Sequence, residues 1–313
     1  MLPLVEDLDV KALHVRAPAN LIFLCGGPFS PEHDGPYQSL RDAFLRVASH
    51  AALKDSDLVL AETFTKEFTF SAHYDDILEF ESDLAQIAEL IILFCESEGS
   101  FAELGAFAHD EEISKRLLVV LRDRFANADS FITLGPIARL RKHREHSVFT
   151  IADDQIGIKN DSHASISLDD FKAVLDTPLR LRLANAREPT TFDARRDGHL
   201  IKLVVGLIQD YGALTEKEIA DAISSLGIEV KIERLRAYLL CAKVVHWIDV
   251  TSIGFDRYYF PLVEQPATEF KVAKEATVKG RNKRLAYIRE FWQAKDKQRF
   301  GVIAKSLGGM ASE

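Results

Sequence analysis

Three glutamates follow an apolar run in the stretch LIILFCESEGSFAELGAF, residues 90–107. The run has the composition of a buried strand, and Glu96, Glu98 and Glu103 come directly after it. A carboxylate at such a place can bind the free amide groups at the start of a helix. It can also attack the anomeric carbon of a sugar or stabilise an oxocarbenium-like transition state. From residue type and spacing alone, both roles stay open.

A helix cap would account for one of these glutamates. Ser100-Phe101-Ala102-Glu103 has the spacing of a capping box, in which Glu103 lies in the first turn. Capping explains neither Glu96 nor Glu98, which add negative charge at the same place. Five small residues would let another group approach this backbone closely: Gly99, Ala102, Gly105, Ala106 and Ala108.

Strands and helices that alternate along the chain must position this segment. Strands are predicted for residues 20–25, 58–60, 90–94, 117–121 and 148–151. Helices are predicted for residues 37–50, 76–89, 101–116 and 136–143. This alternation predicts an α/β fold, with a flavodoxin-like doubly wound parallel sheet that carries helices on both faces. Ligands of such sheets bind at the carboxyl ends of the strands, where Glu103 is expected.

A different pattern begins near residue 196. Three helices are predicted for residues 199–211, 216–226 and 232–244, and two short β segments follow around Gly254. This order is typical of a winged-helix-like α+β domain. The predicted organisation is a catalytic domain at 1–155, a connector at 156–195, the winged-helix-like domain at 196–265 and a basic helical tail at 266–313. One helix is expected within the connector, around residues 168–175.

Charge is distributed unevenly along the 313 residues. Residues 271–305 contain eleven basic and three acidic residues, a net charge of +8, so the remainder carries -17 of the overall -9. The segment therefore either meets a polyanion or folds back onto the acidic body. The residues expected to contact nucleic acid or a partner are Arg234, Arg236, Lys279, Arg281, Lys283 and Arg284.

Composition argues against several classes of protein. No apolar run approaches the ~20 residues of a membrane helix, and the acidic N-terminus does not resemble a signal peptide, so a cytoplasmic location without membrane contact is expected. Cys25, Cys95 and Cys241 are too few and too widely spaced for a disulfide framework or a zinc site. The ten histidines show no metal-ligand spacing, and no metal site is expected.

A basic cluster lies at residues 139–144, where Arg139, Arg141, Lys142 and Arg144 fall within six positions. Three interpretations remain open for it. The cluster could hold a diphosphate, contact a nucleic-acid backbone, or only face water.

The glutamate segment resembles the nucleoside deoxyribosyltransferase family. The shared features are a buried strand, acidic residues, a Gly-Ser pair and the sequence ELG at 103–105. The resemblance implies that Glu103 is the nucleophile that attacks the sugar. FLCGG at 23–27 likewise resembles that family's first strand and the glycine-containing turn beside the nucleoside. The family has an acidic residue six positions before the nucleophile, where this chain has Ser97 flanked by Glu96 and Glu98.

A substrate site is therefore expected between the first strand's turn and the start of the helix. Its expected residues are Cys25, Gly26, Gly27, Ser97, Glu98, Gly99 and Ser100. The glycine pair would let the backbone approach a ligand, although a tight turn would also explain it. Ser97, Ser100 and the free amides at the start of the helix could bind ribose hydroxyls or a phosphate.

A second resemblance covers most of the chain. FLCGG at 23–27, ESEGSFAELGAF at 96–107, SFITLGP at 130–136 and RLRK at 139–142, with the winged-helix-like half, resemble effector proteins of bacterial retrons. That family pairs a deoxyribosyltransferase-like domain with a DNA-binding-type domain, and acts beside a reverse transcriptase and its DNA–RNA hybrid product (msDNA) in defence against phages. The resemblance implies a toxin held silent by these partners in a larger assembly, which can include further copies of the chain, and it implies NAD degradation.

Leaving-group chemistry separates the candidate substrates. A purine or pyrimidine departs poorly unless an acid protonates it, whereas the nicotinamide of NAD already carries a positive charge and leaves as a neutral molecule. Ser97 at the acidic position therefore favours NAD as substrate, with no cofactor. Two alternatives are an N-glycosidase or deoxyribosyltransferase acting on purine nucleosides or nucleotides, and a non-enzymatic DNA-binding regulator.

Overall fold

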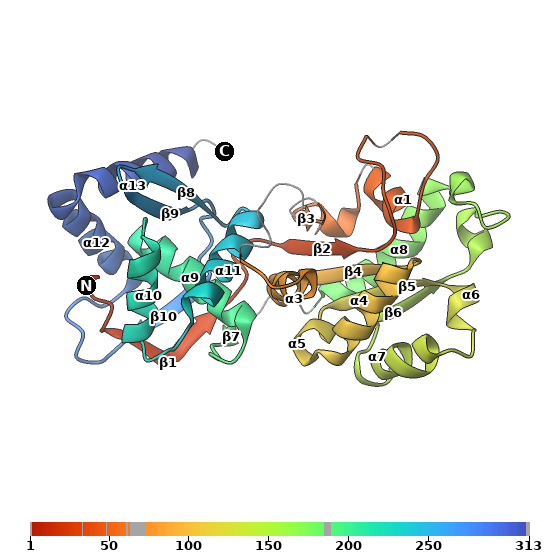
Figure 1. Ribbon diagram of the computed structural model, residues 1–313, viewed down its shortest axis with the longest axis horizontal. Helices are drawn as coiled ribbons and strands as arrows, with labels where there is room; N and C mark the ends of the chain where they lie inside the picture. The colour runs from red at the N-terminus through yellow and green to blue at the C-terminus, as the bar shows by residue number, and fades with distance from the viewer. Residues whose placement is uncertain are drawn as a thin grey trace. The chain divides into compact units, whose positions relative to one another are not determined.

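The computed structural model describes residues 2–32, 34–47, 49–60, 62, 73–184 and 189–310. The chain forms two compact units (Figure 1). We call residues 20–67 and 88–186 the α/β unit, and residues 1–19, 68–87 and 187–313 the helical unit. The N-terminal residues therefore group with the C-terminal half, whereas the sequence predicts one continuous catalytic domain at 1–155.

Five parallel strands form the sheet of the α/β unit, in the order β3-β2-β4-β5-β6. The strands are β2 (Leu21–Cys25), β3 (Asp57–Val59), β4 (Leu90–Cys95), β5 (Leu117–Arg122) and β6 (Val148–Ile151). The helices are α1 (Leu40–Arg46), α4 (Glu98–His109), α5 (Glu111–Ser114), α6 (Asp123–Ala126), α7 (Ala138–His143) and α8 (Leu168–Leu183). The predicted α/β class with a parallel sheet is confirmed.

Helices cover both faces of this sheet. On one face, α1 and α8 place Phe44 and Phe171 against Phe94 of β4, with ring centres 5.4 Å and 6.2 Å away. On the other face, the ring of Phe107 in α4 lies 6.4 Å from that of Phe23 in β2. Every residue of β2, β4 and β5 is buried, as expected for strands between two helical layers.

Helix α8 belongs to the core of the α/β unit, although the sequence places its residues in a connector at 156–195. Phe171, Leu175 and Leu179 follow each other at intervals of four residues and are buried against the sheet. This spacing puts all three side chains on one helical face. A helix over 168–175 is present as expected, but it is longer and forms part of the fold.

The helical unit contains two antiparallel sheets. One has the order β10-β1-β7, with β1 (Leu8–Val15), β7 (Thr190–Thr191) and β10 (Thr268–Val272); the other is a hairpin of β8 (Ile248–Ile253) and β9 (Asp256–Pro261). The helices are α3 (Ile77–Ile87), α9 (Asp197–Tyr211), α10 (Glu216–Ser225), α11 (Ile232–Val244), α12 (Arg281–Lys295) and α13 (Lys297–Met310). The predicted three helices and hairpin are present in that order, whereas β1 and β10 have no counterpart in the sequence prediction.

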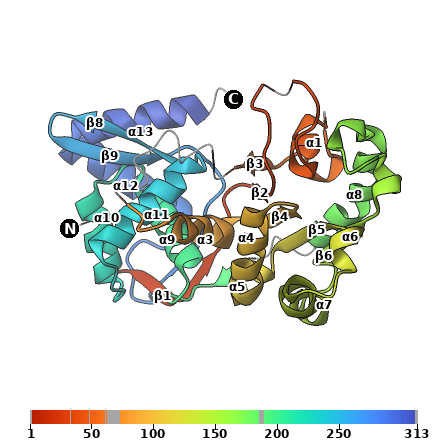
Figure 2. The same cartoon turned by 45° about the vertical axis from the view of Figure 1, so that its right-hand side comes forward.

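Helix α9 is the centre of the helical unit, because almost all of its residues are buried. Gly206 lies where α9 contacts β10, and a Cβ atom there would come within 2.0 Å of Thr268 Oγ1. Helix α13 lies along the β8–β9 hairpin (Figure 2). Across the described part of the chain, no helix has both the length and the apolar character that crossing a membrane requires.

Candidate active site

Glu103 lies in the second turn of α4, behind the carboxyl end of β4. The sequence pattern allowed it to be a capping residue, but α4 begins at Glu98 and its N-cap is Ser97. Ser97 Oγ accepts a hydrogen bond from the Ser100 amide at 3.3 Å, and Ser100 Oγ accepts one from the Ser97 amide at 2.9 Å. The capping box is therefore Ser97 to Ser100, and the capping role of Glu103 is wrong.

One oxygen of the Glu103 carboxylate stands without a hydrogen-bond partner among the described residues. Its Oε2 atom is buried and makes no hydrogen bond. Burial raises the pKa of Glu103 to about 7, while the charge of Arg41 lowers it and that of Glu62 raises it. A buried oxygen without a partner is costly in a folded protein, and such atoms gather at functional sites. This unpartnered oxygen marks Glu103 as the candidate catalytic group.

The glycine pair at the end of β2 is explained by the protein's own packing. Gly26 has φ +147°, and a Cβ atom there would lie 2.8 Å from the Cβ of Phe94. A Cβ atom on Gly27 would lie 2.9 Å from the Cβ of Ser39 and 3.0 Å from Glu96 Oε1. The close approach that the glycines allow is therefore made by neighbouring residues, whether or not a ligand also contacts them. Cys25 before them is buried.

Glu96 has a structural task at this edge. Its Oε2 and Oε1 accept hydrogen bonds from the amides of Leu40 (2.8 Å) and Arg41 (3.2 Å), at the start of α1. Burial raises the pKa of Glu96, and these backbone hydrogen bonds oppose the rise. Glu98, by contrast, is exposed in the first turn of α4, beside the exposed Gly99.

Arg41 and Glu62 were not predicted from the sequence. The Arg41 side chain is 3% exposed; its Nε donates to the Gly27 carbonyl at 2.7 Å and its Nη2 to Glu62 Oε1 at 2.5 Å. Arg41 directly follows Leu40 in an amphipathic helix, and periodicity treats such a position as solvent-facing. Only the three-dimensional fold shows that this cation is buried beside Glu103.

His163 is a further residue that the sequence did not indicate. Its Nε2 is buried, makes no hydrogen bond and lies 3.5 Å from Glu96 Oε2. Burial lowers the pKa of His163, and the nearby Arg122 lowers it further, so the imidazole is neutral at neutral pH and the contact is not an ion pair. Arg122, at the end of β5, is held by Asp153 at 2.7 and 2.5 Å.

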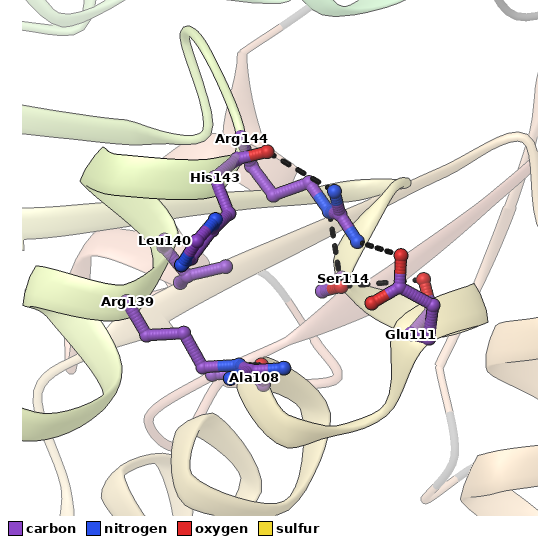
Figure 3. A pocket seen from close by; sticks show the side chains of 7 residues that line it. All are labelled: Ala108, Glu111, Ser114, Arg139, Leu140, His143 and Arg144. Carbon is purple, nitrogen blue, oxygen red and sulfur yellow. Dashed lines mark hydrogen bonds and ion pairs between the residues drawn. The ribbon is translucent and has the colours of Figure 1, made fainter.

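The basic cluster at 139–144 lies at the opposite edge of the sheet from Glu103. Figure 3 shows Arg139 and Arg144 around a cavity of about 230 Å³, formed where α5 and α7 lead into the amino ends of β5 and β6. Arg139 Nε donates to the Ala108 carbonyl at 3.0 Å, and Arg144 Nη2 pairs with Glu111 Oε1 at 2.6 Å. Arg139 thus satisfies a carbonyl in the last turn of α4. Two arginines of the cluster are therefore engaged within the protein, while Arg141 and Lys142 are exposed.

In the helical unit, the two arginines of α11 are engaged within the protein. Arg234 pairs with Glu79 at 2.6 Å, Asp83 at 2.9 Å and Asp197 at 3.0 Å. Arg236 pairs with Glu216 at 2.9 Å and is more exposed. A phosphate contact by Arg234 would have to break these ion pairs, so its predicted nucleic-acid role is the less favourable of the two.

The basic segment at 271–305 combines the two arrangements expected from its charge: part of it folds back onto the acidic body, and part of it is exposed and could meet a polyanion. Its arginines fold back: Arg281 pairs with Asp210 at 2.9 Å, the buried Arg284 donates to the Leu4 carbonyl at 3.0 Å, and Arg299 pairs with Glu218 at 2.7 Å. Lys279 and Lys283 are exposed. Of the residues expected to meet a polyanion, the lysines are therefore the better placed. Within the described ranges, no group of three or more His, Cys, Asp or Glu could hold a metal ion.

Comparison of the sequence with known protein families shows the family of this chain. The sequence model of the STM3845 retron effector protein family matches residues 37–250, more than half of the chain. The chain belongs to this family. The match includes α4 with Glu103 and extends through α9, α10 and α11 of the helical unit.

Two curated relatives come from Escherichia coli. A candidate ribosyltransferase/DNA-binding protein of retron Ec73 is 33% identical over 143 residues, 44% of each chain. A protein of the same description from retron Ec86 is 32% identical over 165 residues, 52% of each chain. The aligned part of this retron effector thus spans about half the length of these curated relatives.

Proposed function

We propose that this retron effector cleaves the N-glycosidic bond of NAD, with Glu103 as the nucleophile. The observation that carries the proposal is the buried Oε2 atom of Glu103, which has no hydrogen-bond partner within the described structure and lies at the ligand-binding edge of a parallel sheet. The names of the two relatives, which include ribosyltransferase, support glycosyl chemistry.

In the proposed reaction, the ionised Glu103 attacks C1′ of the nicotinamide riboside moiety. The C1′–N bond breaks, its electron pair goes to the ring nitrogen, and neutral nicotinamide leaves. Water then attacks C1′ of the glycosyl ester, releases the carboxylate and loses a proton. The products are nicotinamide, ADP-ribose and one proton. No acid is needed for the first step, which agrees with Ser97 being occupied in a helix cap.

The proposed architecture supports this activity. The strand order β3-β2-β4-β5-β6 corresponds to the flavodoxin-like order 2-1-3-4-5, in which the first and third strands flank the ligand site. In the helical unit, three helices precede a hairpin, and Leu214 between α9 and α10 pairs with Tyr259 of that hairpin. We propose that this second arrangement is a winged helix.

The proposed partners follow from charge and family. An effector that degrades NAD would be toxic to its own cell, so its activity must be restrained until infection. We propose that the exposed lysines of the basic segment contact the msDNA of a retron or the reverse transcriptase that carries it. The two relatives' description as DNA-binding proteins agrees with this role.

A second candidate is cleavage of a purine nucleoside or nucleotide. Glu62 favours it, because cleavage of a neutral base draws on a second carboxyl group at the site, and Glu62 lies near Glu103. Incubation of the purified protein with NAD and, separately, with purine deoxynucleosides, followed by separation of the products, distinguishes the candidates. Release of nicotinamide alone supports the proposal, and release of a purine base alone supports the second candidate. Release of neither, from protein freed of its partners, would favour a non-enzymatic DNA-binding regulator.

A further inference from the structure

Arg41 carries a buried positive charge that the proposed mechanism does not use. Three contacts fix its guanidinium, two from the loop after β2 and one from Glu62: the Gly27 carbonyl at 2.7 Å, the Phe29 ring, whose centre lies 5.0 Å from Cζ, and Glu62 Oε1 at 2.5 Å. A buried arginine keeps its charge, and its planar group holds one orientation when several acceptors engage it. The structure thus contains a cation of fixed position at the edge of the sheet where Glu103 lies.

The Glu103 carboxyl group lies within electrostatic range of both Arg41 and Glu62. The positive charge of Arg41 favours the ionised form of the Glu103 carboxyl, and the negative charge of Glu62 disfavours it. The Arg41 backbone is itself fixed, because its amide donates to Glu96 at the start of α1.

The other titratable groups around Glu103 contribute less. Cys95 is the last residue of β4. Burial raises the pKa of its thiol, so the thiol stays neutral. The Glu96 carboxylate is engaged by the amides of α1. Glu98 on α4 itself is exposed to solvent, where water screens its charge.

We propose that Arg41 and Glu62 are a positioning pair: Glu62 and the Gly27 carbonyl anchor the guanidinium, whose fixed charge orients the Glu103 carboxylate for attack. The proposal rests on the role proposed for Glu103. Arg41 gives up no proton and forms no covalent bond. It supplies a preorganised charge that solvent would provide at an exposed site.

The proposal can be tested because Arg41 and Glu62 shift the pKa of Glu103 in opposite directions. Protein labelled with ¹³C at the glutamate side-chain carboxyl is titrated by NMR, and the Glu103 signal is identified as the one missing from the Glu103→Gln variant. In Arg41→Gln, the pKa of Glu103 should rise by roughly 1 unit, because a favourable charge is lost. In Glu62→Gln it should fall by a similar amount, because the amide oxygen still accepts from Arg41 while the unfavourable charge is gone.

Two matched controls remove the same charges from the surface of the α/β unit. Arg180, with a side chain 63% exposed, is changed to Gln, and so is Glu145, with a side chain 87% exposed. Both should leave the pKa of Glu103 within about 0.2 units of wild type. If Arg41→Gln does not fold, Arg41→Lys, which keeps the charge but loses the anchored geometry, should give a smaller rise, and Glu62→Gln remains decisive.

Shifts in the same direction, or no shift in either variant, would overturn the positioning pair. The titration uses no substrate, so its result is independent of the proposed activity. Opposite shifts in a protein that cleaves no NAD would support the pair and refute the NAD proposal. NAD cleavage with an unshifted Glu103 would support the activity and refute the pair.

Discussion

At the scale of single residues, the central feature is a carboxylate whose burial costs stability. The pKa of Glu103 in the folded chain is about 7, above its ordinary value of 4.5. The folded state therefore binds this proton more tightly than the unfolded state, so the stability contributed by the protonated group is fully present below pH 4.5 and is lost as the pH rises through 7. A residue retained at such a cost is expected to serve function.

The first prediction follows from this cost. Glu103→Gln removes the buried charge and keeps the shape of the side chain, so at pH 8 the variant should be more stable than wild type by roughly 1–2 kcal/mol. At pH 4.5 the two proteins should have nearly equal free energies of unfolding. Urea denaturation at both pH values measures the difference. A variant less stable than wild type at pH 8 would show that Glu103 has a structural partner.

The second prediction concerns the rate. A carboxylate must be ionised to act as a nucleophile, so kcat/KM for NAD should rise as the pH increases through about 7, the pKa of Glu103. Initial rates of nicotinamide release between pH 5 and 9, at subsaturating NAD, give this profile. A profile that is flat through pH 7, or that falls there, would contradict nucleophilic attack by Glu103.

The sequence indicates some of these residues and not others, for physical reasons. Glu103 is predictable because it follows a buried strand and a Gly-Ser pair, which are local features. Its freedom from capping is not predictable, because Ser97-x-x-Ser100 and Ser100-x-x-Glu103 both have capping-box spacing and only the backbone decides where the helix begins. Arg41, Glu62 and His163 reach the site through tertiary packing, and no local pattern marks them.

At the scale of elements, α4 positions Glu103, and its cap sets where that helix starts. Ser97 was expected to bind substrate, but its hydroxyl accepts the Ser100 amide. The third prediction is that Ser97→Ala lowers the free energy of unfolding by about 1 kcal/mol, the usual effect of a lost N-cap. Urea denaturation measures this effect. For the rate of nicotinamide release, Ser97→Ala is compared with Phe101→Leu, a substitution on the same helix but outside the cap.

The kinetics of Ser97→Ala separate the two roles of the serine. If Ser97 only caps α4, the KM for NAD should stay within about twofold of wild type, and kcat should fall modestly because Glu103 is less well fixed. A KM that rises more than about tenfold with unchanged stability would instead assign Ser97 to substrate binding.

Elements with a strong period were predictable, and those that depend on distant partners were not. Strands β2, β4 and β5 are continuous apolar runs and were expected within one or two residues. Strands β1 and β10 pair with each other across more than 250 residues, and the short pattern of either segment does not show this pairing. The length of α8 was underestimated because Pro178 lies within it, although its apolar residues continue to Leu179.

At the scale of the whole chain, the basic segment divides largely by residue type, with Arg289 exposed like the lysines. Arginines are suited to pair with buried or half-buried carboxylates, and here Arg281 and Arg299 do so. The lysines remain in solvent, where they can exchange counterions for phosphates. Net charge predicts that such a segment has an anionic partner, but it does not show whether the partner is the protein itself or another molecule.

The fourth prediction tests this division. Lys279, Lys283 and Arg289 are exposed, and replacing all three by Gln should lower the slope of log affinity against log salt by up to ~3 for a DNA–RNA hybrid duplex, with unchanged stability. The matched variant replaces Arg281, Arg284 and Arg299, and should lose stability instead. Fluorescence anisotropy at several salt concentrations measures binding. An unchanged slope in the first variant would remove the basic segment from the interface.

The most direct test of the account is nicotinamide release by wild-type protein and by Glu103→Gln, each purified free of its partners and incubated with NAD at pH 8. We expect wild type to release nicotinamide and ADP-ribose in equal amounts, and the folded variant to be slower by about 10³-fold or more, because it lacks the nucleophile. Glu145→Gln, the same change at an exposed position of the α/β unit, should match wild type. Near-normal release by a folded Glu103→Gln protein would contradict the account.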